Sequence, residues 1–359
     1  MKKSYSSKAF TLIELMVSIF ITITIIASFY KLYNASVKTE RAASIRVAVN
    51  LMGEQMIDTI AESVRLIGLN SSEVDFIGDS TAGLSQNIIL SAKENELVFF
   101  SPFGSPITKV KEVDGDLATK CSFTLFNSAA FHNGVTKLYF HNQDGVFKTS
   151  TMSVSATSGD DVTVEATFAS GSGSCKDMFP NGSLVTGEDF KYTLQYGASG
   201  NDNELKLSCE KEVSGVWTSD PNCSLIDFSY SEDNAATNFY SMPKFILEYL
   251  IEDCVREPSG SLTCTTKWES SSEGFDSAKI RDIIAVRFGF VLLSRKERIY
   301  AGNDSDSTLP KYCIFEDVIE GNSELYCYQL PSLNYTASVF RRIIFLSNYR
   351  FFVDQNRPV

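Results

Sequence analysis

The chain has 359 residues, 43% of them hydrophobic, and a formal net charge of −12 at pH 7. This length allows one large or two ordinary domains, and the hydrophobic content excludes a largely disordered chain. The acidic balance disfavours direct binding to nucleic acid, because phosphate recognition needs clustered Lys and Arg side chains. We therefore expect a folded protein without a direct nucleic-acid partner.

The N-terminal stretch MKKSYSSKAFTLIELMVSIFITITIIASFY places basic residues before a long apolar segment. Residues 10–30 contain neither Pro nor Gly, and as a helix they span roughly 31 Å, enough to cross the hydrocarbon core of a membrane. Lys2, Lys3 and Lys8 precede this segment and Lys31 follows it, which predicts a cytoplasmic N-terminus and export of everything after Lys31. We therefore expect a single membrane-spanning segment.

Glu14 is an acid inside this otherwise apolar segment. A carboxylate at membrane depth costs on the order of 2.5–3.5 kcal/mol, and less near the interface. One interpretation is that Glu14 lies near the end of the helix and reaches the lipid headgroups. The other interpretation requires a cation that pairs with the Glu14 carboxylate. A cut between Ala9 and Phe10 would leave an α-amino group one helical turn from Glu14, in the same chain or in a neighbouring one.

The stretch KAFTLIELMVSIFI resembles the N-terminal signature of the type IV prepilin family, which includes pilins and the pseudopilins of type II secretion. The resemblance implies that a prepilin peptidase cuts between Ala9 and Phe10 and that Phe10 is then N-methylated. It also implies that Glu14 neutralises the N-terminal amine of a neighbouring subunit during filament assembly. Ala9 stands where the family usually has glycine. Because alanine is also small, we expect cleavage, at a lower rate.

The helical spacing of apolar residues continues beyond the first segment as far as residue 69. The apolar positions recur every three or four residues, as on an amphipathic helix. They are Ile45, Val49, Met52, Met56, Ile60, Val64 and Ile67. Gly68 and Asn70 are plausible stop signals. One helix over residues 10–69 would be about 90 Å long, with its second half packed on its own head domain.

Residues 70–359 are expected to form the β-rich head. Short strand-like runs alternate with clusters of Gly, Ser, Asn and Asp, which is typical of an antiparallel sheet. The expected strands cover 96–100, 121–126, 137–141, 189–196, 203–210, 223–230, 244–254, 283–294 and a closing strand in 338–352. Polar stretches at 151–161, 170–188 and 302–308 are expected to be surface loops. The predicted fold class is therefore α+β, with a long N-terminal helix packed on a large antiparallel head.

The run IIAVRFGFVLLS, residues 283–294, gives the strongest strand signal. Its even-numbered residues from Ile284 to Leu292 are all apolar and share one face of a strand. Arg287 and Gly289 interrupt the apolar residues on the other face. We therefore expect a strand with one well-buried face.

The eight cysteines include no C-x-x-C pair. An even number without that spacing favours disulfides in an oxidising compartment over a zinc site or a thioredoxin-type motif. Sequential pairing is plausible, and hairpin-like spacing supports the first two of these pairs: Cys254–Cys264, Cys313–Cys327, Cys209–Cys223 and Cys121–Cys175. Spacing alone leaves other connectivities open.

The order of the segments in the head resembles that of PilW-like minor pilins. The segments concerned are YTLQY, NELKLSCE, CSLIDFSY, IIAVRFGFVLLS and FRRIIFLSNYR. The resemblance implies a minor pilin in the initiation or tip complex of a type IV pilus that serves adhesion, motility or DNA uptake. It implies as partners other minor pilins, the major pilin, the prepilin peptidase, the inner-membrane assembly platform and a tip adhesin. The expected location is the inner membrane before assembly, with a periplasmic head, and the surface pilus afterwards.

Three alternatives remain open from sequence. A type II secretion pseudopilin shares the N-terminal helix but usually has a smaller head. A DNA-uptake filament subunit requires salt-sensitive DNA binding by the head. A membrane-anchored extracytoplasmic enzyme requires a pocket with converging titratable groups, and we expect no enzyme. The histidines, His132 and His141, are expected to be structural or exposed, since no nucleophile or hydrolase motif accompanies them.

Four acidic clusters carry oxygen ligands of the kind that Ca²⁺ prefers, at residues 113–116, 158–161, 199–204 and 302–307. None has the spacing of an EF-hand loop. Solvated turns in an acidic protein explain them, so we expect no metal and no cofactor. Residues 302–307 are the best candidate if one of the clusters binds Ca²⁺.

Overall fold

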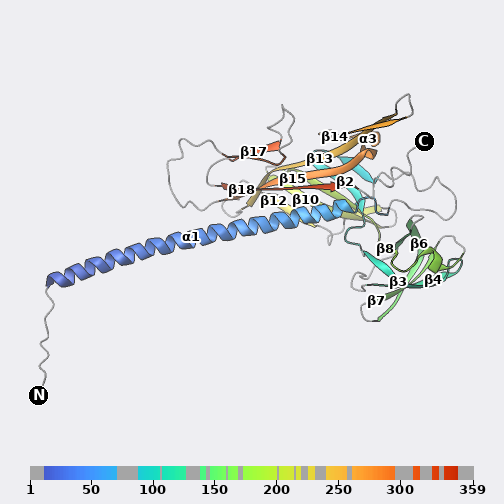
Figure 1. Cartoon of the computed structure of the whole chain (residues 1–359), viewed down its shortest axis with the longest axis horizontal. Coiled ribbons are helices and arrows are strands. Elements are labelled where there is room, and N and C mark those ends of the chain that lie inside the picture. The colour runs from blue at the N-terminus through green and yellow to red at the C-terminus, as the bar shows by residue number, and fades with distance from the viewer. Residues whose placement is uncertain are drawn as a thin grey trace, which may run out of the picture.

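The structure, a computed structural model, describes residues 12–70, 88–105, 107–126, 138–142, 146–158, 161–168, 173–199, 202–213, 216–219, 225–230, 240–256, 261–295, 310–315, 326–330 and 335–346. One long helix, α1 (Leu12–Arg65, 54 residues), extends from a head built of strands (Figure 1). At 1.5 Å per residue, α1 is about 81 Å long. The arrangement confirms the predicted α+β fold, a long N-terminal helix followed by an antiparallel β-rich head.

The second half of α1 packs on the head along the apolar stripe that the sequence predicts. The buried members are Val49, Met56, Ile60, Val64 and, just beyond the helix, Ile67, while Ile45 and Met52 pack at the margin of the same core. The helix ends at Arg65, and Gly68 then adopts a φ of 77°, a left-handed conformation that favours glycine. The predicted stop signal is thus the residue that turns the chain out of the helical direction.

The first sheet of the head is antiparallel and lies against α1 and the second sheet. Its strand order is β1-β2-β9-β10-β11, and β12 pairs with β10. The bounds are β1 (Ile89–Ala92), β2 (Glu96–Ser101), β9 (Phe190–Ser199), β10 (Asp202–Val213), β11 (Val216–Ser219) and β12 (Ile226–Tyr230). Alternate apolar side chains such as Leu97, Leu194 and Leu205 are fully buried in the core shared with α1. This alternation is what a strand with one buried face requires.

The second sheet has the order β14-β13-β15-β18 and carries the docking surface for α1. The bounds are β13 (Tyr240–Arg256), β14 (Leu262–Glu269), β15 (Ile283–Arg295) and β18 (Tyr335–Phe345). A short helix, α3 (Ser277–Arg281), precedes β15 and is capped by Asp276, whose side chain accepts a hydrogen bond from the backbone N–H of Lys279.

The prediction that β15 has one well-buried face is incomplete, because residues 285–293 are buried on both faces. Val286, Phe288 and Phe290 face the core shared with α1. The opposite face, with Val291 and Leu293, is covered by a two-stranded hairpin, β16 (Lys311–Cys313) and β17 (Cys327–Gln329). A nearly continuous apolar run is typical of a central strand buried on two sides.

Three contacts fix α1 on β18. The Phe340 ring lies against Gly53, and the ring stacks on Phe290 with centroids 5.3 Å apart. Ser338 Oγ donates a hydrogen bond to Asn50 Oδ1 at 3.0 Å. Arg342 pairs with Asp58. The helix is therefore held by close packing in the middle and by polar contacts on either side.

A closed six-stranded barrel forms a second lobe of the head, which the sequence did not predict. Figure 1 shows it at the end of the head opposite the N-terminus of α1. Its order is β3-β4-β7-β6-β5-β8, closed by pairing of β3 with β8. The bounds are β3 (Ile107–Asp116), β4 (Lys120–Leu125), β5 (Tyr139–His141), β6 (Val146–Ser158), β7 (Asp161–Phe168) and β8 (Leu184–Thr186), with the short helix α2 (Cys175–Met178) between β7 and β8.

The whole barrel is an insertion between β2 and β9, which are neighbours in the first sheet. Five phenylalanine rings pack together in its interior: Phe123, Phe140, Phe147, Phe168 and Phe179. Asn70, at the end of the turn after α1, joins the barrel to the helix. Its side chain donates to the backbone oxygen of Gly187 at 3.0 Å and accepts from Thr186 Oγ1 at 2.5 Å.

The loop predicted at 151–161 is wrong, because residues 151–158 belong to β6 and Asp161 begins β7. The polar composition that indicated a loop reflects exposed side chains such as Thr151 and Ser153 on the outside of the barrel. Within the predicted loop 170–188, residues 175–178 form α2 and residues 184–186 form β8. The third predicted loop, 302–308, lies outside the described residues.

Three of the four expected cysteine pairs form disulfides, namely Cys121–Cys175, Cys254–Cys264 and Cys313–Cys327. The first joins β4 to the N-terminus of α2 in the barrel, and the other two join directly opposed residues of hairpins. Cys209 is also disulfide-bonded, and its expected partner, Cys223, lies outside the described residues.

Candidate functional site: the exposed half of helix α1

The first half of α1 is apolar and uncovered. Every residue from Leu12 to Tyr33, here called the exposed stem, is exposed, with Leu12 at 77% and Tyr33 at 67%. The helix is long and apolar enough to cross a membrane, and none of its most apolar window is buried by the rest of the chain. An exposed apolar surface of this extent marks contact with lipid or with other protein.

The serine and threonine hydroxyl groups of the exposed stem bond to the helix itself. The Oγ of Ser18 donates to the backbone oxygen of Glu14 at 2.8 Å, and Thr22, Thr24 and Ser28 make the same contact four residues back at 2.7–2.8 Å. Such back-bonding satisfies a hydroxyl without water. The stem can therefore enter a membrane or a bundle of helices without leaving these groups unbonded.

Glu14 lies in the first turn of α1. An acid at this position interacts favourably with the positive end of the helix dipole. Along the stem the charged residues are Glu14 and Lys31. The two predicted processing residues, Ala9 and Phe10, lie outside the described residues, so their relation to Glu14, the predicted assembly residue, stays a prediction.

His141 is a structural residue of the barrel. Its Nε2 is 3.0 Å from Thr186 Oγ1. Burial lowers the pKa of His141 to about 4, so the ring is neutral at pH 7. His132 lies outside the described residues.

In the described parts of three of the acidic clusters, carboxylates bond within the protein. The Asp114 and Asp116 carboxylates accept hydrogen bonds from the backbone N–H groups of Gly115 and Ala118, each at 2.8 Å. Asp161 pairs with Lys111 at 2.5 Å. In the third cluster, Glu204 pairs with Lys206 at 2.7 Å. The fourth, 302–307, lies outside the described residues.

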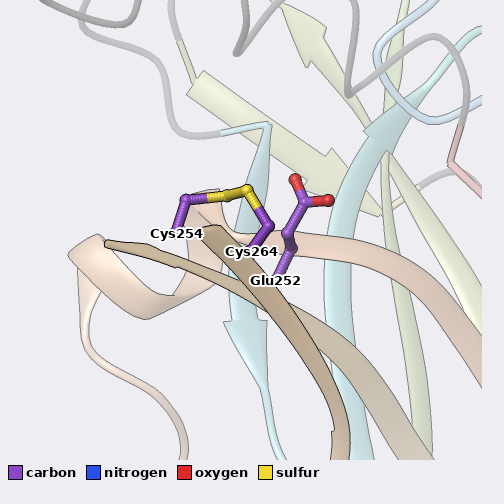
Figure 2. A group of neighbouring side chains, drawn as sticks. All are labelled: Glu252, Cys254 and Cys264. Carbon is purple, nitrogen blue, oxygen red and sulfur yellow. A yellow bond between two sulfur atoms is a disulfide. The ribbon is translucent and has the colours of Figure 1, made fainter. Parts of the chain in front are cut away.

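Within the part of the chain that the structure describes, one group of metal-ligand residue types lies on β13 and β14. It comprises Glu252, Cys254 and Cys264, shown in Figure 2. The two sulfur atoms are joined as a disulfide, so neither is a thiolate that could bind a metal ion. The proximity of these residues follows from the hairpin register, in which Cys254 lies opposite Cys264.

The structure brings together a buried polar network that the sequence reasoning missed. Glu248 of β13 lies opposite Arg287 of β15, with Arg287 Nε 2.5 Å from Glu248 Oε2. The two side chains are 2% and 7% exposed, respectively. The guanidinium carbon of Arg287 lies over the rings of Trp268 and Phe315, 4.5 and 4.4 Å from their centroids. One signal was available, since each charge interrupts an apolar run, FILEYLI or IIAVRFGFV.

No family model matches this chain, and no curated protein matches it. Among solved structures, a match is found to the type IV-like pilin TTHA1219 from Thermus thermophilus, at 9% sequence identity and a TM-score of 0.22. The match covers 60% of this chain and 84% of that chain. At this TM-score the likeness supports no argument about function.

Proposed function

We propose that this chain is a minor pilin that assembles through α1 into the initiation or tip complex of a type IV pilus. The observation that carries the proposal is the position of Glu14, in the first turn of an exposed apolar helix whose other end is anchored in a β-rich head. The prepilin-like sequence around residue 10 supports the same assignment. No catalytic step is part of the proposed function.

The proposed mechanism depends on the cost of placing a carboxylate in an apolar environment. Stems of several subunits associate side by side, first in the inner membrane and then in the filament. Cleavage after Ala9 exposes the α-amino group of Phe10, and Glu14 of one subunit pairs with that amine on its neighbour. Removing one partner of such a pair leaves a buried charge, so correct axial register is strongly favoured over other registers.

The head supports this role by holding the second half of α1. The contacts of Asn50, Gly53 and Asp58 with β18 fix the helix on the head, so that a displacement of the stem is transmitted to the head. The proposed partners are other minor pilins and the major pilin, together with the prepilin peptidase, the assembly platform and a tip adhesin. A head this large is compatible with a few copies at the end of a filament.

The proposal is tested by replacing Glu14→Gln in cells that assemble the filament. Both wild type and variant are expected to be cut and to start at N-methylated Phe10, as read by mass spectrometry. The variant is expected to accumulate in the membrane and to fall at least about tenfold in sheared surface filaments, since a loss of 1.4 kcal/mol changes an equilibrium tenfold. Glu54→Gln, which removes an exposed acid from the same helix, is the matched control.

Two outcomes contradict the proposal. Equal incorporation of Glu14→Gln and wild type would remove the role of the carboxylate in register. Isolation of the chain from filaments with residues 1–9 still attached would remove the amine that Glu14 is proposed to meet.

A further inference from the structure

A cavity of about 380 Å³ lies in the head, where segments distant in the sequence meet. Its lining comes from the β1–β2 turn, the end of β9, the start of β13, and one residue each after β14 and before β17. The residues are Glu94, Asn95, Tyr196, Gly197, Pro243, Lys244, Phe245, Ile246, Ser270 and Tyr326. We call this site the head cavity. No residue of α1 lines it, so it is separate from the stem.

Backbone hydrogen bonds fix the three main segments relative to one another. The N–H of Leu247 donates to the carbonyl of Glu94 at 3.1 Å, and the N–H of Tyr196 donates to the carbonyl of Asn95 at 2.8 Å. The N–H of Glu94 in turn donates to the carbonyl of Ser271 at 2.9 Å. The head cavity is therefore preformed, as small-molecule sites usually are.

Two tyrosine rings of the wall are held through their hydroxyl groups. Tyr196 donates to the carbonyl of Met242 at 3.0 Å, and its ring lies 5.5 Å from that of Phe245. Tyr326 donates to Glu248 Oε1 at 2.7 Å. Burial, together with the hydrogen bond to Glu248, raises the pKa of Tyr326 to about 12, and burial raises that of Tyr196 above its usual value. Both rings are thus neutral and fixed.

The buried ion pair of Glu248 and Arg287 contacts this wall through Tyr326. A buried pair such as Glu248 and Arg287 adds little net stability, because the desolvation of both charges offsets their attraction. Here Glu248 accepts from Arg287 on one oxygen and from Tyr326 on the other. The pair therefore orients Tyr326 toward a fixed position beside the cavity.

The polar groups at the head cavity are balanced in charge. Among the described residues, the side chains of Glu94, Asn95 and Lys244 make no hydrogen bond or ion pair. They offer a carboxylate, an amide and an ammonium group, which together can accept and donate hydrogen bonds. An anionic ligand would be repelled by the carboxylate of Glu94, and a cationic ligand would be repelled by the ammonium group of Lys244. A neutral ligand with many hydroxyl groups satisfies all three.

We propose that the head cavity binds a neutral mono- or disaccharide. The C–H face of a sugar ring packs on the fixed tyrosine rings, while its hydroxyl groups bond to Glu94, Asn95 and Lys244. The volume lies at the lower end of the range of small-ligand sites, which suits one or two sugar rings. This inference does not depend on assembly through the stem, so each can fail without the other.

The test uses the full chain in a detergent without a sugar headgroup, because glycoside detergents would compete. Saturation-transfer NMR is recorded with glucose, galactose, N-acetylglucosamine and lactose, and with sialyllactose as an anionic comparison. We expect saturable transfer to at least one neutral saccharide, with a Kd on the order of 0.1–1 mM.

The decisive variant is Gly197→Leu. A Cβ at Gly197 meets no atom within 4 Å, and the backbone conformation there is an ordinary one, so the new side chain can be accommodated at the cavity wall. We expect binding at least about tenfold weaker, a loss of 1.4 kcal/mol or more. Ser219→Leu, an exposed site on β11 outside the cavity, introduces the same side chain and should leave binding unchanged.

Asn95→Ala supplies a second test that does not depend on filling the cavity, since it removes an exposed amide. It should weaken binding several-fold with an unchanged melting curve. The proposal is overturned if no neutral saccharide binds at tens of millimolar, if only sialyllactose binds, or if both Gly197→Leu and Asn95→Ala bind as wild type does.

Discussion

Phe340 of β18 lies against Gly53 of α1 so closely that a Cβ on residue 53 would overlap its ring. The ring cannot easily turn away, since it is 6% exposed and stacks on Phe290. Glycine normally weakens a helix interior by about 1 kcal/mol relative to alanine. Here it allows the helix to approach the sheet at the centre of the docking surface.

We predict that Gly53→Leu destabilises the full chain by on the order of 1–3 kcal/mol, because an overpacked contact forces neighbouring groups to move. Urea unfolding in detergent, followed by circular dichroism, measures the change. Glu54→Leu places the same side chain on an exposed position of the helix and should stay within about 0.5 kcal/mol of wild type. Adding Phe340→Ala to Gly53→Leu should recover part of the loss. A Gly53→Leu variant as stable as wild type would show that the contact is easily relieved.

Because Glu248 and Arg287 form a buried ion pair, we expect the effects of replacing them on the free energy of unfolding to be strongly non-additive. Removing one partner, as in Glu248→Leu or Arg287→Met, leaves an uncompensated buried charge and should cost about 3–5 kcal/mol in the free energy of unfolding. The double variant should recover most of that loss. A double-mutant cycle by urea unfolding makes the comparison, and simple addition of the two single effects would contradict a direct interaction.

We expect the disulfide of the barrel, Cys121–Cys175, and that of the β13–β14 hairpin, Cys254–Cys264, to stabilise different parts of the head by different amounts. Cys121 and Cys175 are fully buried and 54 residues apart in the sequence, so replacing both by alanine should destabilise the barrel by about 4 kcal/mol on the chain-entropy model. Cys254 and Cys264 are 10 residues apart in a hairpin whose partner strand β14 is largely exposed, and the same model gives about 3 kcal/mol. Hydrogen exchange followed by mass spectrometry localises each effect. Faster exchange in the barrel should follow only the first replacement.

Because His141 is buried in a neutral form, we expect the barrel to lose stability on acidification. Its folded pKa is about 4, against an ordinary value of 6.5, because burial disfavours the charged ring. The unfolded chain therefore binds more protons than the folded chain between these two pKa values. The contribution of His141 to the free energy of unfolding is complete above about pH 6.5, and it falls by on the order of 2–3 kcal/mol as the pH approaches 4.

The measurement compares barrel exchange rates at pH 6.5 and 5, after correction for the intrinsic rate. His141→Gln keeps a side chain that can bond to Thr186 but does not titrate, so its stability should change less over this interval. An equal change in both proteins would assign the pH dependence to other groups.

The helix and the strands were predictable from local patterns. The three- and four-residue spacing from Val49 to Val64 specifies which face of α1 is buried, and the alternation in residues 283–294 specifies a strand. The charge of Glu14 stands out because its neighbours along the chain are apolar. In each case the signal lies within one element, where side-chain direction follows directly from position.

The barrel and the buried network were not predictable in this way. Closure of the barrel depends on pairing between β3 and β8, which lie far apart in the chain. The exposed Ser and Thr residues of β6 give this strand the polar composition that is typical of a loop. Glu248 and Arg287 each interrupt an apolar run, but only the register of β13 on β15 brings them together. The lining of the head cavity depends on the same long-range pairing.

The insertion of the barrel between β2 and β9 has an evolutionary and practical consequence. Ser101 and Phe190 lie opposite each other at the last paired position before the insertion, so a short turn could join β2 to β9 directly. The lobe can thus be lost, exchanged or replaced by a foreign domain while the sheet that supports α1 keeps its strand order. Since the barrel lies at the end of the head remote from the exposed stem (Figure 1), a domain grafted in its place would be carried at the far end of the subunit.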